Sequence, residues 1–227
     1  MSTAQVVAVV LVGMLVGLDL ASVPQAMIAR PLVAGWLGGL VVGNPLPGLA
    51  IGALCELFAL ETLPIGAARY PDWGPGTVAA GALAGAHSQG ILASGLLGLV
   101  VVAVAAAQAG GLLIHLVRRG NVRTTAVHRA ALEAGDARAI RAVQRHGLFS
   151  DAVRSSALTA VTLAAGDLLS SLFAREWGSP QKVALIAIAS TSTGVALLAG
   201  WRLAGQDRRG LWLAAGLTAG VLLVAAR

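Results

Sequence analysis

Charged residues are scarce in this chain, and aromatic residues and cysteine are scarcer still. Of its 227 residues, 11% are charged, 4% are aromatic and one is cysteine. A typical soluble domain carries about 25% charged residues, so the composition excludes an ordinary soluble protein. The single cysteine, Cys55, excludes an internal disulfide, and because it lies in an apolar run we interpret it as a small buried residue.

The sequence also lacks the usual signatures of catalysis and metal binding. No Ser-His-Asp arrangement, phosphate-binding glycine loop or dinucleotide fingerprint is convincing. His115, His128 and His146 do not have the tight spacing to cysteine or acidic partners that a metal site needs. We therefore assign no catalytic residue, metal or cofactor, and we expect that the chain is not an enzyme. The net charge of +6 comes from arginines in loops, a pattern that sets membrane topology and does not indicate nucleic-acid binding.

Hydrophobic and small residues make up most of what is present. Hydrophobic residues account for 57% of the chain, there are 29 glycines, and the mean hydropathy is +0.81. Small residues let helix backbones approach closely in lipid, where packing drives association. The composition predicts an all-α integral membrane protein with one intramembrane domain. The first apolar segment has no Lys or Arg before it, so we expect it to be retained and not removed as a signal peptide.

Several apolar segments are long enough to cross a bilayer, which takes about 20 apolar residues in a helix. The best candidates are 91–117, 155–173 and 183–201. The full series of apolar stretches predicts a polytopic helical bundle and runs through about 4–18, 31–43, 48–61, 76–86, 91–117, 155–173, 183–201 and 211–226.

The N-terminal third is irregular. Seven of the eight prolines fall between Pro24 and Pro75. The short stretches 31–43 and 48–61 are separated by Asn-Pro-Leu-Pro, so we expect a re-entrant, Pro/Gly-broken helical hairpin over 31–61 and not two full crossings.

Arginines are concentrated in the segment 118–154, which contains eight of them against three acidic residues. Apolar residues recur there at helical spacing, and the excess of arginine predicts a cytoplasmic location. We therefore divide the chain into an N-terminal membrane core at 1–117, a cytoplasmic basic helical loop at 118–154, and C-terminal transmembrane helices at 155–227.

Five charged residues lie within or beside the broken segments: Arg30, Glu56, Glu61, Arg69 and Asp72. Charge at membrane depth is costly unless it lines a cavity or is paired, so these residues are the candidate substrate site. We expect Glu56 and Asp72 to accept hydrogen bonds from substrate, with Arg30 and Arg69 holding them. The alternatives are a structural ion pair for Glu56 and a cap or turn for Asp72. Glu61 is equally suited to bind substrate or to pair with Arg69.

Several motifs in this region occur in a characteristic order. They are Arg30-Pro31-Leu32, Gly39, Gly43-Asn44, Gly52, Glu56, Ile65-Gly66-Ala67-Ala68 and Pro71-Asp72. By these motifs the chain resembles, over roughly residues 5–155, the membrane IIC component of mannose/sorbose-type sugar phosphotransferase systems. The chain departs from the pattern at Asn44, where aspartate is common, and at Glu61, where a small residue is usual.

The resemblance implies a multi-pass protein of the inner (cytoplasmic) membrane that acts as a sugar-translocating subunit. It implies a IID-type membrane partner, a hexose-like sugar bound in their joint core, and soluble IIB/IIA-type phosphocarrier proteins, together forming an oligomeric complex. The IIB-type partner would carry out phosphoryl transfer. The departures leave two alternatives open: a structural or regulatory membrane protein that kept the fold but lost transport, and a carrier of another small solute without phosphorylation.

Overall fold

All regular secondary structure in the described part of the chain is helical. The computed structural model describes residues 1–20, 22–60, 70–87 and 93–173, and these residues contain helices and no strand. The all-α expectation is therefore confirmed, while the segments predicted at 183–201 and 211–226 lie outside the described residues. The helices are α1 (Thr3–Asp19), α2 (Pro31–Val41), α3 (Pro45–Ala59), α4 (Trp73–Ala86), α5 (Ala93–Val127), α6 (Arg129–Glu133) and α7 (Ala137–Phe173).

Helix α4 is the centre of the core. Every residue from Trp73 to Gly85 is buried, and α1, α2, α3, α5 and α7 all pack against this helix. A helix that is apolar on all sides is stable only when other helices surround it. Its sequence, WGPGTVAAGALAGA, consists mostly of small residues, so the surrounding backbones come close to its axis.

Helices α2 and α3 form the hairpin that the sequence predicts. Pro31 and Pro45 each begin a helix, a position where the missing proline N–H costs nothing. Gly43, between the helices, has a φ of 85°, which a glycine adopts without strain. The helices contain 11 and 15 residues. They are therefore about 16 and 22 Å long, shorter than the roughly 30 Å hydrocarbon layer, as a re-entrant hairpin requires.

Glycine-to-glycine contact holds the hairpin closed. A Cβ atom built on Gly35 would lie 2.5 Å from the carbonyl oxygen of Gly48 and 2.8 Å from the Cα of Gly52. Such distances leave no room for any side chain, and both opposing groups are backbone. The glycine repeat in this region is therefore a packing requirement of α2 against α3.

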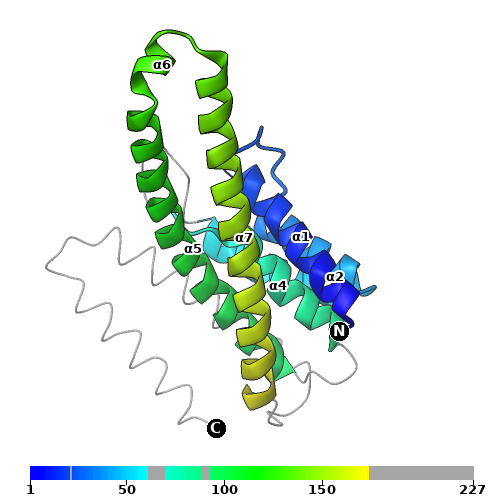
Figure 1. Cartoon of the computed structure of the whole chain (residues 1–227). Helices are drawn as coiled ribbons and strands as arrows, with labels where there is room; N and C mark the ends of the chain where they lie inside the picture. The colour runs from blue at the N-terminus through cyan, green and yellow to red at the C-terminus, as the bar shows by residue number, and fades with distance from the viewer. Residues whose placement is uncertain (21, 61–69, 88–92, 174–227) are drawn as a thin grey trace, which may run out of the picture.

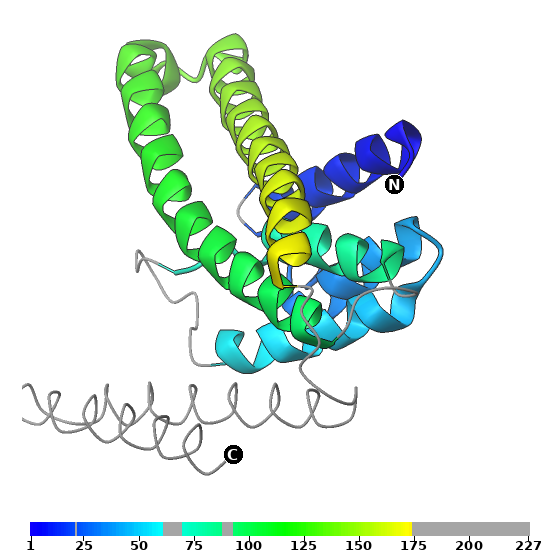
Figure 2. The ribbon, with the colours of Figure 1, turned by 90° about the horizontal axis from the view of Figure 1, so that it is seen from below.

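Helices α5 and α7 run side by side and extend well beyond the core (Figure 1). Figure 1 shows the short helix α6 joining them at the end far from α1 and α4, and Figure 2 shows the shorter helices α1 to α4 gathered beside the pair. We call the segment from Arg118 to Arg154 the arm. It consists of the end of α5, the short helix α6 and the first half of α7. The expected boundaries at 117/118 and 154/155 fall inside α5 and α7 and not in loops.

One helix in the described part of the chain is long and apolar enough to cross a membrane, at Gly98–Val127. Helices α1, α2 and α3 are apolar but shorter. The expected crossing at 155–173 forms the second half of α7, where buried residues such as Leu158 and Leu163 alternate with exposed ones such as Val161 and Leu168.

The close contact in the hairpin leads to a test of stability. Gly35→Ala should lower the free energy of unfolding by about 1–3 kcal/mol, because the added methyl group is forced against backbone. Gly120→Ala is the matched control, because a Cβ atom at this position on α5 would have nothing within 4 Å. Replacing a helical glycine that has open space around it should be neutral or stabilise the protein by about 0.5–1 kcal/mol. Unfolding in mixed detergent micelles measures both, and equal stability of the two variants would contradict the packing role.

Candidate functional site

Asp72 lies at the start of the central helix and is fully buried. Its backbone N–H donates to the carbonyl oxygen of Ala107 on α5 at 2.8 Å. One carboxylate oxygen, Oδ2, accepts a hydrogen bond from the Arg154 guanidinium, while the other, Oδ1, is buried without a hydrogen-bond partner among the described residues. The guanidinium of Arg154 offsets the cost of burying the Asp72 carboxylate, because an unpaired charge in an apolar interior is very unfavourable.

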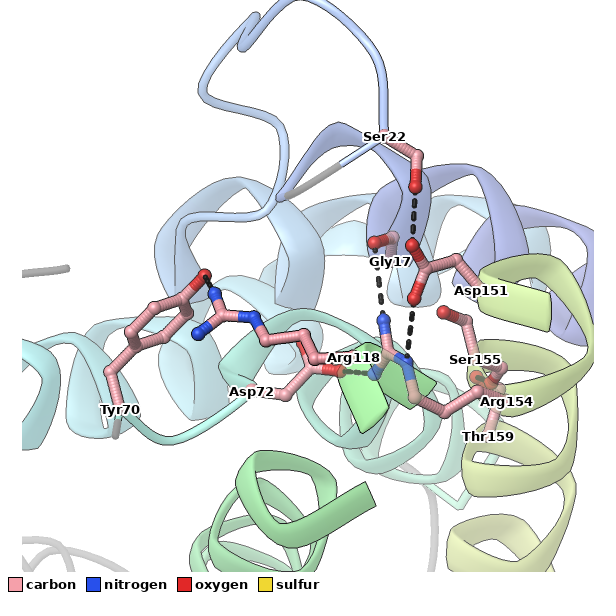
Figure 3. A network of polar contacts seen from close by, with 9 residues as sticks. All are labelled: Gly17, Ser22, Tyr70, Asp72, Arg118, Asp151, Arg154, Ser155 and Thr159. Carbon is pink, nitrogen blue, oxygen red and sulfur yellow. Dashed lines mark hydrogen bonds and ion pairs between the residues drawn. The ribbon is translucent and has the colours of Figure 1, made fainter. Parts of the chain in front are cut away.

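Arg154, on α7, is the centre of a polar network inside the core (Figure 3). Its Nε donates to Oδ1 of Asp151 at 3.2 Å, and a terminal nitrogen lies 3.5 Å from the carbonyl oxygen of Gly17 on α1. Asp151 in turn accepts a hydrogen bond from the Ser22 hydroxyl on its other oxygen. The guanidinium group therefore joins α1, α4, α7 and the connection that follows α1.

Arg154 and Asp151 are functional candidates that the sequence did not predict. In the sequence both belong to the basic segment whose excess of arginine indicates topology. The available signal is their spacing: the polar residues 151, 155, 159 and 162 follow one another at intervals of three or four, and Arg154 lies three residues after Asp151, so all five share one side of α7. All five are buried, at 7% exposure or less.

Arg30 and Glu56 form an ion pair between the two helices of the hairpin. Glu56 on α3 also accepts a hydrogen bond from the backbone N–H of Leu32, at 3.1 Å. The carboxylate thus sits at the N-terminus of α2, where free N–H groups and the helix dipole favour negative charge. The structural pairing considered for Glu56 is therefore present. The other two candidates, Glu61 and Arg69, lie outside the described residues.

An inner cavity of about 180 Å³ lies between the connection after α1 and the start of α4. Arg30 and Asp19 supply its charged side chains, Gln25 an amide, and Tyr70 and Trp73 aromatic rings. The remaining lining residues are Leu20, Met27, Ala29, Pro31, Ala59 and Pro71.

Asp19 shapes the loop over this cavity. It is 2% exposed, and its two oxygens accept backbone N–H bonds from Ala26 at 2.6 Å and Ala29 at 3.2 Å. Between these two residues Met27 has a φ of 62°, a conformation that costs a non-glycine residue about 1–2 kcal/mol. The two hydrogen bonds to Asp19 hold the backbone in this conformation, so Asp19 determines the form of the cavity wall.

The structure brings two of the predicted site residues together and places a third elsewhere. Arg30 and Glu56 touch each other, and Arg30 lines the inner cavity. Asp72 pairs with Arg154 instead, although its neighbours Pro71 and Trp73 line the same cavity. Direct binding of substrate by Glu56 or Asp72 stays a prediction. Among the described residues, no group of three or more His, Cys, Asp or Glu side chains could hold a metal ion.

Short paired helices, glycine packing and charged side chains held inside an apolar core define an all-α membrane protein. The family model of the sorbose-specific IIC component of phosphotransferase systems matches residues 3–177. The chain therefore belongs to this family, which confirms the resemblance to mannose/sorbose-type IIC components.

Individual relatives agree with this assignment. The mannose-specific EIIC component of Escherichia coli (strain K12) is 31% identical over 153 residues, which is 67% of this chain and 55% of the relative. The fructose permease IIC component of Bacillus subtilis (strain 168) is 34% identical over 131 residues, or 57% of this chain and 45% of the relative. The chain thus spans about half the length of the curated relatives it matches.

Two solved structures share the fold. One is described as a membrane protein, with a TM-score of 0.68, 23% identity, and coverage of 100% of this chain and 96% of the other. The second is the cryo-EM structure of the mannose transporter ManYZ with microcin E492, with a TM-score of 0.61, 23% identity and coverage of 100% and 95%.

The Arg154 network leads to a second test of stability. Arg154→Gln should lower the free energy of unfolding by about 3–5 kcal/mol, because it leaves two buried carboxylates without their cation. Arg129→Gln is the control, since Arg129 forms an exposed ion pair with Glu133; it should cost about 0–1 kcal/mol. Adding Asp72→Asn to Arg154→Gln should recover part of the loss, and a further loss would contradict direct coupling. Unfolding in mixed micelles compares the variants.

Proposed function

We propose that this protein is the sugar-translocating IIC subunit of a phosphotransferase-type transport system, and that it binds a hexose-like sugar together with a IID-type membrane partner. The observation that supports this proposal most is the family match over residues 3–177, which includes all seven described helices and the inner cavity. A soluble IIB-type protein, supplied by IIA, would carry out phosphoryl transfer, so this chain would recognise and pass the sugar without catalytic residues of its own.

The inner cavity is the proposed place of sugar binding. Ligand sites in proteins are mostly apolar and aromatic, with a few polar groups that fix the orientation of the ligand. Tyr70 and Trp73 supply the rings here, while Arg30 and Gln25 supply donors and acceptors for hydroxyl groups. The guanidinium of Arg30 is suited to paired hydroxyls because its donors lie in a rigid plane.

Glu56 and Asp72 have supporting roles in this proposal. Glu56 fixes the guanidinium of Arg30 through their ion pair and anchors α2 through Leu32. Asp72, paired with Arg154, holds Pro71 and Trp73 against the cavity. This assignment reverses the order expected from the sequence, in which the acidic residues bind sugar and the arginines hold them. Glu61 and Arg69 remain candidates on the segment that precedes Tyr70.

We further propose a multi-pass protein of the inner membrane whose arm is cytoplasmic and contacts the soluble IIB-type partner. The eight arginines between Arg118 and Arg154, against three acidic residues, favour the cytoplasmic side. Their charge also suits a partner with an acidic surface, because complementary charge speeds association.

Glu56→Gln separates recognition from folding. The amide still accepts the Leu32 N–H but removes the charge that holds Arg30. If Arg30 binds sugar in this position, affinity should fall about 10- to 150-fold, since a charge-assisted hydrogen bond contributes about 1.5–3 kcal/mol. Glu133→Gln makes the same chemical change in an exposed ion pair on the arm and should leave affinity unchanged. Calorimetric titration of the co-purified complex with mannose and fructose measures the effect.

Thermal unfolding of the same samples identifies the competing explanation. Lost stability with unchanged sugar affinity would leave Glu56 a purely structural role. If the unaltered complex binds neither of the two hexoses and no sugar co-purifies with it, the structural or regulatory alternative is favoured instead. Transport of sugar without its phosphorylation would indicate a carrier that is not coupled to the phosphotransferase reaction.

The arm allows a test of orientation. Protease added to inverted membrane vesicles should cut within 118–154, and protease added to right-side-out vesicles should not. Charge reversal of Arg138, Arg141 and Arg145 should weaken binding of the IIB-type partner, because it removes attraction from one helix of the arm. Cleavage from the periplasmic side would overturn the orientation, and unchanged IIB binding would remove the docking role.

A further inference from the structure

An outer cavity of about 390 Å³ lies at the base of the arm, next to the inner cavity. Both are lined by Leu20 and Tyr70, so these two side chains form a wall common to the two spaces. The outer cavity is about twice as large as the inner one. Its other lining residues come from α5, α7 and the connection after α1: Ser22, Ile114, Val117, Arg118, Asn121, Gly147, Leu148 and Asp151.

Arg118 fixes the tyrosine of this common wall. Its terminal nitrogen donates to the Tyr70 hydroxyl at 3.3 Å, and its guanidinium carbon lies 5.6 Å from the centre of the ring (Figure 3). Both a hydrogen bond and a cation–π contact therefore orient the ring. In the described part of the chain Arg118 forms no ion pair, so its remaining N–H donors are available to a ligand.

Asn121 offers a second available group. It lies three residues after Arg118 and so on the same side of α5. Its side-chain oxygen is buried and has no hydrogen-bond partner within the described ranges. Buried polar atoms are nearly always paired in folded proteins, so this unpaired acceptor at a cavity indicates a missing donor, such as a ligand hydroxyl. The carboxylate of Asp151, in contrast, is already bonded through both oxygens, to Arg154 and to Ser22.

The two cavities differ in charge. Among the described residues at the inner cavity, the ion pair of Arg30 with Glu56 is neutral, which leaves the negative charge of Asp19. Asp151 lines the outer cavity and shares Arg154 with Asp72, which leaves one negative charge, and Arg118, which forms no ion pair among the described residues, offsets it. The arm beyond contributes further arginines, whose summed field favours anions. The inner cavity therefore suits a neutral sugar better than an anionic one, and the outer cavity accepts an anion.

We propose that the outer cavity binds the phosphate monoester of the transported sugar, through Arg118 and Asn121, after the sugar has passed Tyr70. This inference rests on the proposed function, because it assigns to one chain the neutral and the phosphorylated forms of the same ligand. A guanidinium group binds phosphate through paired N–H donors, and the unpaired Oδ1 of Asn121 can accept a hydrogen bond from a hydroxyl of the sugar. The larger volume provides room for the added phosphoryl group. Asp19 repels the phosphorylated form from the inner cavity.

The test compares two neighbouring arginines in the full chain, co-purified with its membrane partner. Calorimetry measures binding of mannose, fructose, mannose 6-phosphate, fructose 1-phosphate and inorganic phosphate. Arg118→Gln should weaken sugar phosphate binding about tenfold or more and hexose binding by a smaller factor, because the hexose loses only the contact that orients Tyr70. Arg119→Gln, an exposed change of the same charge on the next residue, should alter neither. Arg118→Lys, which keeps the charge without the fork of donors, should give an intermediate affinity.

Each other result overturns the proposal. Equal losses for hexose and sugar phosphate in Arg118→Gln would place Arg118 in a single sugar site. Unchanged sugar phosphate binding would remove Arg118 from recognition. Inorganic phosphate binding as tightly as the sugar phosphates would reduce the cavity to a simple anion site. A complex that binds hexose but no sugar phosphate contradicts this inference alone, whereas one that binds no sugar in either form contradicts the proposed function as well.

Discussion

One buried cation, Arg154, determines how the core helices of this protein meet. Its guanidinium contacts Asp72 at the start of α4, Asp151 on its own helix, and the carbonyl oxygen of Gly17 on α1. In an apolar interior no water can replace these contacts, so each carboxylate must stay where the arginine reaches it. The start of α4, and with it the aromatic wall of the inner cavity, therefore depends on the side chain of the last residue of the arm.

Small residues make this arrangement possible. Gly110 on α5 faces Asp72, and a Cβ atom there would lie only 2.6 Å from the Cβ of the aspartate. Gly17 and Gly35 allow equally close approach elsewhere in the core. Because the helices pack closely, buried polar side chains are confined to a few positions, and some of these, such as Asp19 and Asp151, line the cavities. Close packing and buried polarity are therefore two results of the same composition.

Much of the fold could be predicted from the sequence, and less of the site. The low content of charged residues and the high content of small residues are sufficient to predict a membrane protein. The short apolar runs on either side of Asn44-Pro45 are sufficient to predict the hairpin. The pair of Arg30 with Glu56 is one of the predicted alternatives. Arg154 could not be singled out, because in sequence its charge resembles a topology signal and spacing alone does not reveal which buried acid, 82 residues away, it meets. Asp72 is buried and polar as expected, but its partner required the three-dimensional packing.

Helix α5 is continuous from the core to the tip of the arm. Within the core it accepts the backbone N–H of Asp72, farther along it presents Arg118 and Asn121 to the outer cavity, and it ends beside α6. With 35 residues it is about 52 Å long and has no proline at which to bend. Because Arg118 and Asn121 lie on this helix between the core contact at Ala107 and the tip, a force on the tip would move both residues in the same direction as the tip, over a smaller distance.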